Sequence, residues 1–242
     1  MNILSFGGGV NSTSLLVLAI QGKLEVDAIL FADTKCEMPE TYEHLEKIIK
    51  PLCKENKIPF YEVTKGNLLH DYWEKNLIPF RAFRSCTDNY KIRPLKKFAK
   101  QFTDVTWIIG IDYGEKHRAE RFNFFGSNHI FPLIDMEIDR EGCKQIIKDF
   151  GMPIPVKSGC WFCPFTSKNG WISLYENHRD LFENAMTFEK NCKKYPEYTL
   201  IGTKTLEETE QLIKQFLKTK RDQKSLCGWI ETKGEPCIFC HS

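Results

Sequence analysis

The sequence predicts an α/β protein with a doubly wound, mostly parallel sheet, helices on both faces, and a small helical, cysteine-containing C-terminal lobe. Two observations predict this fold. Short apolar runs alternate with helical stretches through the first 136 residues, a pattern typical of parallel strands joined by crossover helices. Polar loops follow three of the apolar runs, beginning at Gly7, Asp33 and Asp112. Parallel strands bring such loops to one edge of a sheet, where ligands bind.

The expected elements begin with a strand over residues 2–6 and a helix over residues 12–20, which Gly22 closes in a position that favours glycine. Apolar residues three and four apart make residues 39–53 an amphipathic helix. The remaining elements of this half are strands 26–32, 60–63 and 105–111 and a helix over residues 93–102.

After residue 136 the pattern becomes helical and irregular, and we expect helices over residues 170–189 and 205–218. The sequence therefore predicts two domains. The first is an α/β domain over residues 1–136, and the second is a helical lobe over residues 137–242 that carries a CxxC motif and a cysteine-containing tail.

Composition is that of a soluble globular chain, with 42% hydrophobic and 27% charged residues. No apolar run is long enough to span a bilayer, so we expect a cytoplasmic protein with no membrane partner. A net charge of +2 does not by itself indicate nucleic-acid binding. Two basic runs, residues 91–100 and 214–224, are read first as solvated helix faces, and an RNA partner stays open.

The stretch NILSFGGGVNSTSLL, from Asn2 to Leu16, predicts an anion site. A strand that ends in glycines and leads into a Ser/Thr-rich helix start presents free backbone N–H groups at the positive end of a helix dipole. A Walker A lysine is missing before the Ser/Thr pair. The residues expected to bind phosphate are Ser5, Gly7, Gly8, Gly9, Asn11, Ser12 and Thr13.

This loop resembles the pyrophosphate loop of the N-type ATP pyrophosphatases, and most closely that of the phosphoadenosine phosphosulfate (PAPS) reductase family. Three further segments are similar to that family in the same order: FADTKCEMPETYEHL from Phe31, CTDNYKIRPL from Cys86 and GIDYGEKHRAER from Gly110. The resemblance implies ATP or a related adenine nucleotide as the ligand.

Two positions depart from the family pattern. The usual first Ser of the loop is Gly7, and the usual Asp is Asn11. Loss of a carboxylate at position 11 removes a candidate ligand for Mg²⁺, whereas Asn keeps its hydrogen-bonding ability. We therefore expect phosphate binding to survive and metal-assisted pyrophosphate release to be less certain.

The resemblance also places residues near the nucleotide after the second and fourth strands. Asp33, Glu115 and Arg118 are the catalytic candidates, and Asp33, Thr34, Gly110 and Arg121 are further nucleotide-binding candidates. Arginine suits phosphate or sulfate because its planar fork donates two parallel hydrogen bonds. Surface ion pairing is the alternative for Glu115 and the arginines.

Ten cysteines in a chain of this kind favour metal or redox chemistry. Cys160-x-x-Cys163 fits a redox pair, half a zinc site or half an iron–sulfur site. Cluster-containing sulfonucleotide reductases resemble the arrangement of a middle cysteine and a later CxxC, so the expected ligands are Cys86, Cys160, Cys163 and Cys240. We favour a 4Fe-4S cluster, with zinc held by Cys160, Cys163, Cys237 and Cys240 as the alternative.

The leading hypothesis is an adenine-nucleotide-dependent enzyme that adenylates a substrate and transfers sulfur to it with help from the cluster. A sulfonucleotide reductase that releases sulfite is the alternative, with Cys227, Cys237 or Cys240 as its nucleophile. A non-catalytic nucleotide- or metal-binding module is the third hypothesis. The expected partners are a sulfur donor or a reductant such as thioredoxin, with tRNA as a candidate substrate.

Overall fold

The computed structural model describes residues 1–120, 122, 128–202 and 204–231, with side chains described up to residue 220. The chain divides into two compact units, one formed by Met1–Lys75 and Ala82–Cys163, the other by Asn76–Arg81 and the chain from Pro164 onward. Within the described ranges, no helix combines the length and the apolar character that crossing a membrane requires.

The first unit is built on a five-stranded, all-parallel sheet with strand order β3-β2-β1-β4-β5. This confirms the predicted α/β class. The strands are β1 (Asn2–Phe6), β2 (Ala28–Asp33), β3 (Phe60–Thr64), β4 (Thr106–Ile109) and β5 (His129–Ile130). β5 was not predicted, because two residues are too few to produce a strand pattern.

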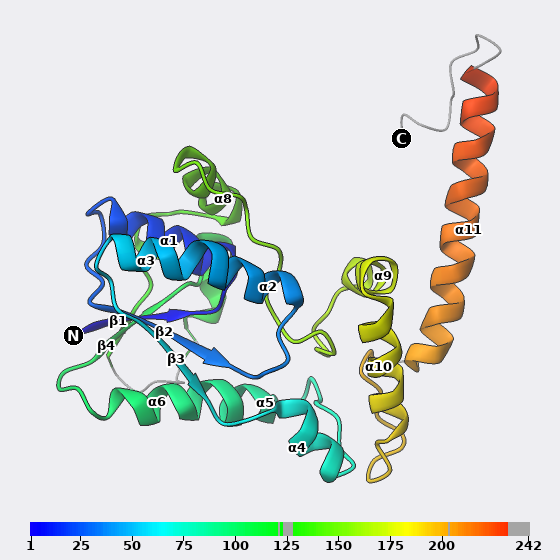
Figure 1. Ribbon diagram of the computed structural model, residues 1–242, viewed down its shortest axis with the longest axis horizontal. Helices are drawn as coiled ribbons and strands as arrows, with labels where there is room; N and C mark the ends of the chain where they lie inside the picture. Colours follow the sequence, from blue (N-terminus) through cyan, green and yellow to red (C-terminus); the bar gives the residue numbers. More distant parts are fainter. Residues whose placement is uncertain (121, 123–127, 203, 232–242) are drawn as a thin grey trace. The chain divides into compact units, whose positions relative to one another are not determined.

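Helices cover both faces of the sheet, with α1, α3 and α8 on one side and α6 on the other (Figure 1). They are α1 (Val10–Ile20), α2 (Pro39–His44), η1 (Leu45–Ile49), α3 (Lys50–Glu55), α4 (Leu68–Glu74), α5 (Ser85–Thr87), η2 (Asp88–Ile92), α6 (Arg93–Ala99), η3 (Tyr113–Arg118), α7 (Pro132–Asp135) and α8 (Arg140–Asp149).

Alternation along the strands divides the apolar core between these two helix layers. Leu4 and Ile29 pack on the side of α1 and α8, whereas Ile3 and Leu30 pack with Leu95 of α6. Successive strand residues point to opposite faces, so each strand feeds both layers. Burial on both faces explains why the strands read as nearly continuous apolar runs.

Two helices contain a π-helical stretch just before a proline. η1 ends at Ile49, two residues before Pro51, and η2 ends at Ile92, two residues before Pro94. Proline has no N–H and its ring crowds the preceding turn, and here the helix widens into a π turn and continues. The predicted helix at 93–102 therefore begins earlier, at Ser85, which places Cys86 on a helix.

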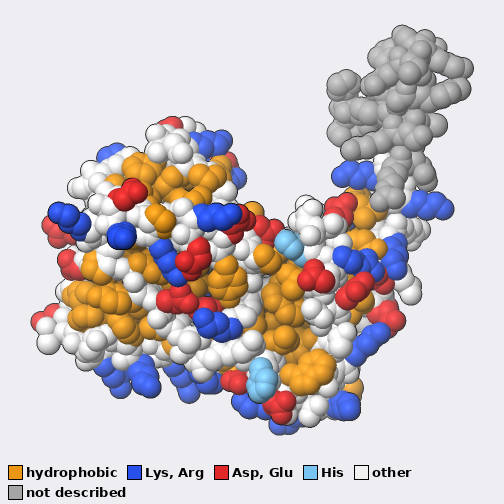
Figure 2. All heavy atoms as spheres, viewed as in Figure 1, with side chains coloured by type: hydrophobic (Ala, Val, Ile, Leu, Met, Phe, Trp, Pro, Cys, Tyr) orange, Lys and Arg blue, Asp and Glu red, His pale blue; other side chains and the backbone are white. Residues whose placement is uncertain are grey.

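Outward-facing lysines line the solvent side of α6. Lys96, Lys97 and Lys100 are exposed, and Figure 2 shows basic side chains gathered along that edge of the first unit. This distribution fits the expectation that the basic run over residues 91–100 is mainly a solvated helix face.

The second unit is helical, as predicted for this part of the chain. Its helices are α9 (Lys168–Asn177), α10 (Arg179–Lys190) and α11 (Leu206–Glu231). The single helix expected over residues 170–189 is broken at His178, whose backbone is non-helical (φ −138°, ψ 64°). This break lets Trp171 of α9 pack edge-on against Phe182 of α10.

Buried Glu189 joins α10 to the start of α11. Its two carboxylate oxygens accept the backbone N–H groups of Leu200 (2.7 Å) and Leu206 (2.6 Å). Burial raises the pKa of Glu189 above its ordinary value. Because both oxygens are used as backbone acceptors, Glu189 is a structural residue of this unit.

We expect Ile29→Ala to lower the free energy of unfolding of the first unit by about 2–5 kcal/mol, because it empties a fully buried site between sheet and helices. Ile130→Ala is the matched control on edge strand β5, where the side chain is 38% exposed. It should cost about 1 kcal/mol or less. Denaturant titrations compare the two variants, and equal losses would contradict this description of the core.

Candidate functional site

The loops after β1, β2 and β4 meet at the carboxyl edge of the sheet. The strand order reverses between β1 and β4. From β1 the chain adds β2 and then β3 on one side of β1, and it then returns to add β4 and β5 on the other side. Ligands of open parallel sheets bind at such a reversal. Gly7–Gly9 follows β1 and Gly110 follows β4, so both loops border this position.

The glycine loop, Gly7–Gly9, places backbone without side chains directly before the start of α1. Gly8 has φ +73°, and a Cβ there would lie 2.9 Å from Thr41 Cγ2. A Cβ at Gly9 would lie 2.9 Å from Ser158 Oγ. The backbone angle therefore favours glycine at Gly8, and a Cβ at either position would have to displace a neighbouring side chain. Ser158 was not predicted as a site residue, because no motif marks it.

Helix α1 begins at Val10, two residues earlier than predicted, and no side chain of the described residues caps it. The first-turn N–H groups of a helix have no acceptors within the helix. Left uncapped, they point toward the loop and carry the positive end of the helix dipole. This arrangement suits a phosphate group.

The two hydroxyl residues predicted to contact phosphate are buried. Ser12 Oγ donates to the carbonyl of Gly9 (3.1 Å) and accepts the N–H of Gly7 (3.3 Å). Thr13 is fully buried, and its Oγ1 has no hydrogen-bond partner among the described residues. Ser12 thus braces the loop from inside, while the preceding Ser5 lies within β1.

Asn11 links the start of α1 to the loop after β4. Its Nδ2 donates to the carbonyl of Gly110 (3.1 Å) and to Oδ2 of Asp112 (3.0 Å). A Cβ at Gly110 would lie 3.3 Å from the backbone nitrogen of Ser12, so the two loops approach closely. Asp112 is 3% exposed and was missed by the sequence reasoning, which weighed Glu115 and Arg118 instead.

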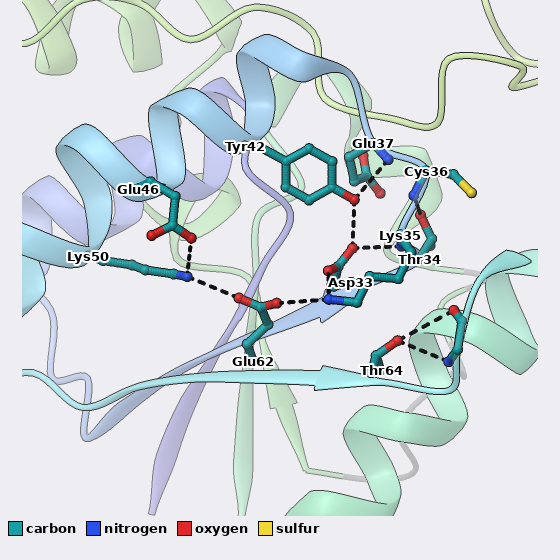
Figure 3. Close-up of polar contacts among 11 residues, drawn as sticks. Asp33, Thr34, Lys35, Cys36, Glu37, Tyr42, Glu46, Lys50, Glu62 and Thr64 are labelled. Atoms are coloured by element: carbon teal, nitrogen blue, oxygen red, sulfur yellow. Dashed lines mark hydrogen bonds and ion pairs between the residues drawn. The ribbon is translucent and has the colours of Figure 1, made fainter.

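Asp33 anchors the loop after β2 (Figure 3). Its Oδ1 accepts the backbone N–H of Lys35 (2.7 Å) and the hydroxyl of Tyr42 (2.8 Å), and its Oδ2 pairs with Lys35 Nζ (2.6 Å). Burial alone would raise the pKa of Asp33, but the bonds from Lys35 and Tyr42 outweigh it and hold that pKa below its ordinary value. These contacts are those of a positioning residue.

The CxxC segment runs alongside the β2 loop. Glu37 and Cys160 form an antiparallel bridge, and the N–H of Trp161 donates to the carbonyl of Cys36 (3.1 Å). Thr34 Oγ1 and Cys160 Sγ lie 3.2 Å apart. The segment therefore places a thiol against a residue that was expected to contact nucleotide.

One ion pair neutralises the buried carboxylate of Glu37 beside the CxxC segment. Lys91 Nζ pairs with Oε1 of fully buried Glu37 at 2.7 Å. Burial alone would lower the pKa of Lys91, but the attraction of Glu37 raises it above its ordinary value. Burial also raises the pKa of Cys160 well above its ordinary value, with a further increase from Glu37.

Glu115 and Arg118 lie on η3, where they form an ion pair with each other. Both side chains are about half exposed, at 46% and 49%. The surface ion pair that the sequence left open is thus present, and their catalytic assignment stays a prediction. Arg121 and Cys240 lie outside the described residues, as does Cys237.

The expected metal ligands were tested against the described part of the chain. Within it, no three Cys, His, Asp or Glu side chains come together in a way that could hold a metal ion. Cys86 is on α5, and Cys160 already contacts Thr34. The described cysteines therefore do not by themselves form an iron–sulfur or four-thiolate zinc site, and we derive no chemical step through such a group.

The strand order and the uncapped start of α1 define a parallel α/β domain with a glycine loop at the point where the strand order reverses. Residues 1–140 match the phosphoadenosine phosphosulfate reductase domain family. The chain belongs to this family, which confirms the resemblance seen in its motifs.

Two uncharacterized proteins of Methanocaldococcus jannaschii are similar in sequence. One is 27% identical over 195 residues, which are 74% of this chain and 45% of that protein. The other is 27% identical over 135 residues, which are 53% of this chain and 26% of that protein. The chain thus spans less than half the length of these relatives.

Two solved structures are similar in fold. The PAPS reductase from Candida auris, in complex with phosphate, has a TM-score of 0.48 and 16% identity, over 66% of this chain and 82% of that one. The U34-tRNA thiolase NcsA from Methanococcus maripaludis, with its [4Fe-4S] cluster, has a TM-score of 0.45 and 13% identity, over 88% of this chain and 71% of that one.

We expect Asp33→Asn to remove a pH-dependent part of the stability. Because the folded pKa lies below the ordinary 3.8, the contribution of this carboxylate is fully present above that pH and is lost as pH falls through the folded pKa. The variant should lower the free energy of unfolding at neutral pH by about 1–3 kcal/mol. Its free energy of unfolding should also decrease less than that of wild type as the pH is lowered into the acid range.

Urea titrations from about pH 3 to pH 7 measure this effect. Glu43→Gln, which breaks the exposed pair with Lys47, is the control and should change little. If the free energy of unfolding of Asp33→Asn decreases in acid as steeply as that of wild type, the Lys35 and Tyr42 contacts do not set the Asp33 pKa.

Proposed function

We propose that this protein is an adenine-nucleotide-dependent enzyme that activates its substrate by adenylation and then transfers sulfur to it. The observation that carries the proposal is the uncapped start of α1 at the β1/β4 reversal, where Gly8 and Gly9 keep side chains out of the loop. Backbone N–H groups arranged in this way favour a polyphosphate. Family membership supports a nucleotide as the compound that carries it.

In the proposed reaction, an oxygen of the acceptor attacks the α-phosphorus of ATP, and pyrophosphate leaves with the electron pair of the broken bond. A sulfur nucleophile then attacks the activated carbon, and AMP leaves with the acceptor oxygen. The glycine loop binds the phosphates and stabilises the charge on the leaving pyrophosphate. Asp33 positions the loop after β2 through Lys35 and Tyr42.

The CxxC segment is the part of the site suited to sulfur. Cys160 lies 3.2 Å from Thr34 Oγ1, and Thr34 directly follows β2 at the nucleotide edge. A thiol held beside the nucleotide is placed to take the outer sulfur of a donor persulfide, whose own thiolate leaves, and to hold that sulfur as a Cys160 persulfide. We assign this relay to Cys160, with Cys163 as its neighbour in the CxxC turn.

The sulfonucleotide reductase remains the second candidate, because the matching family takes its description from that reaction. Its nucleophile would come from Cys227, Cys237 or Cys240. The backbone of Cys227 belongs to α11, and Cys237 and Cys240 lie outside the described residues. ATP/pyrophosphate exchange distinguishes adenylation, and thioredoxin-dependent release of sulfite distinguishes the reductase. If the protein binds ATP but shows neither activity, the result favours the non-catalytic binding module.

An iron–sulfur cluster is the competing assignment of Cys160, because a thiolate bound to iron cannot also carry a persulfide, and the described cysteines do not establish the cluster. Visible absorption of anaerobically purified protein, with iron and zinc analysis, tests it directly. The cluster assignment expects iron and sulfide, and a loss of both in Cys86→Ala and in Cys160→Ala, whereas the relay assignment expects neither in wild type. Stoichiometric zinc in a colourless protein would overturn the cluster. Metal retained by Cys86→Ala would move the ligands to the tail cysteines.

We expect Gly8→Ala to weaken ATP binding by at least about tenfold, because the added methyl group would displace Thr41 and distort the loop. Gly22→Ala is the matched control. Gly22 has nearly the same backbone angle (φ +71°), but a Cβ there would meet no described atom within 4 Å.

Both substitutions carry the cost of a left-handed backbone, about 1 kcal/mol each, so both should be similarly destabilised. Isothermal titration with ATP should then separate them, with affinity lost only in Gly8→Ala. Equal affinity in the two variants would remove the glycine loop from the proposed site.

A further inference from the structure

We propose that the outer edge of strand β3, beside helix α3, binds an extended acidic segment of a partner protein, which adds to the sheet as a further strand. This binding surface consists of the outward-facing backbone of β3 and a neighbouring cavity with lysines in its lining. It lies at the start of β3, whereas the candidate nucleotide site lies at the carboxyl edge of the sheet. The inference therefore goes beyond the proposed function and does not depend on it.

Half of the backbone groups of β3 point away from the sheet. In the described chain, β3 is the last strand on its side. The Ile29 N–H donates to the carbonyl of Pro59 (2.8 Å), so the odd-numbered residues of β3 bond to β2. The even-numbered residues Phe60, Glu62 and Thr64 then direct their N–H and C=O groups outward. No backbone hydrogen bond reaches these outward groups from the described residues. An edge of this kind can pair with another strand.

A cavity of about 540 Å³ lies beside this edge, with a lining from α3 and the start of β3. Its volume is within the range of pockets that bind ligands. The fully buried Cys53 contributes to an apolar part that suits an apolar side chain. The apolar lining residues are Cys53, Ile58, Pro59 and Phe60, and the charged ones are Lys50, Lys54, Lys57 and Glu62.

The charges around the cavity favour an anionic partner. Lys50 and Lys35 both pair with Glu62, at 3.1 and 3.5 Å, and Glu62 lies between them in Figure 3. The acid in the lining is thus neutralised. Lys54 and Lys57 are exposed, and neither forms an ion pair with the described residues. Two cations therefore remain available for the carboxylates of a bound segment.

Lys57 has a backbone conformation that favours glycine. Its φ is +56°, and it lies in the turn that ends α3. In this turn the Ile58 N–H donates to the carbonyl of Cys53 (2.9 Å), and the Lys57 N–H donates to that of Lys54 (3.2 Å). Helices that end with this pair of bonds usually have glycine at the left-handed position. Glycine at position 57 would thus relieve the backbone and remove a charge from the cavity.

An acidic peptide fits this surface better than a second copy of the chain does. In strand addition, main-chain hydrogen bonds provide affinity and side-chain pockets provide specificity. Side chains of an added strand alternate between its faces, so one face can carry both acids for the lysines and an apolar group for the cavity. A second copy would offer β3 itself, whose acid Glu62 is already paired.

The test measures binding of the acetylated peptide Glu-Thr-Phe-Thr-Asp-Thr-Glu to the full chain by isothermal titration. Its alternation places the acids and the phenylalanine on one face. The control peptide has lysine at every acidic position. Wild type should bind the acidic peptide at least about tenfold more tightly than the control. This affinity should fall as salt rises from about 50 to about 300 mM, because salt screens exposed charges.

Lys57→Gly separates lost binding from misfolding. It should weaken peptide binding by about two- to fivefold, while the urea midpoint of unfolding stays the same or rises because glycine suits the turn. Lys54→Glu should weaken binding by at least as much. Its matched control is Lys97→Glu, which reverses an exposed charge on α6 and should leave peptide binding unchanged.

Two substitutions at Glu62 test the strand edge itself. Glu62→Pro removes an outward N–H and leaves the bonds to β2, which belong to the neighbouring residues. Glu62→Ala removes the same side chain but keeps that N–H. The alanine variant should bind at least as well as wild type, and the proline variant should bind about three- to tenfold more weakly than the alanine variant.

Equal affinity for the two peptides, or unchanged affinity in Lys57→Gly and Lys54→Glu, would overturn this inference. A wild-type mass that doubles with concentration, and that Glu62→Pro returns to that of one chain, would assign the edge to a second copy and overturn it as well. ATP binding is measured separately on the same wild-type protein. Its failure would overturn the proposed function and leave the β3 edge unaffected.

Discussion

The site depends on the contact between Asn11 and the Gly110 carbonyl, because this hydrogen bond joins the two loops between which the strand order reverses. At such a reversal the connecting helices leave in opposite directions, and the sheet alone leaves a crevice open there. Gly110 lets the loops approach until a Cβ would meet the Ser12 nitrogen at 3.3 Å. This contact joins the start of α1, whose first-turn N–H groups have no side-chain cap, to the loop after β4.

The electrostatics of the edge then follow from which charges are already paired. Lys35 neutralises Asp33 and Lys91 neutralises Glu37, so neither lysine is a strong candidate for phosphate binding. The positive potential available to an anion is mainly that of the helix start.

The sequence predicted what depends on local pattern. Apolar runs located the sheet, and the glycines before Ser12 and Thr13 located the loop between β1 and α1. It could not show that the Asn11 amide donates to Asp112, because the two residues lie 101 positions apart in the chain. Nor could it show that Ser12 braces the loop internally, or that a π turn before Pro94 carries the helix back to Cys86. These features arise from tertiary packing, which the periodicity of apolar residues in the sequence does not report.

The family match ends at residue 140, yet the loop is completed by residues beyond it. Ser158 closes against Gly9, and Cys160 pairs with the backbone of Glu37 and contacts Thr34. The first 140 residues therefore contain the glycine loop and the start of α1, whereas Ser158 and Cys160 come from the segment beyond them. In the proposed function these two stretches have separate roles, because the glycine loop would bind the nucleotide and the CxxC segment would carry the sulfur. Under that proposal, the reaction can change through residues 157–163 while nucleotide binding stays the same.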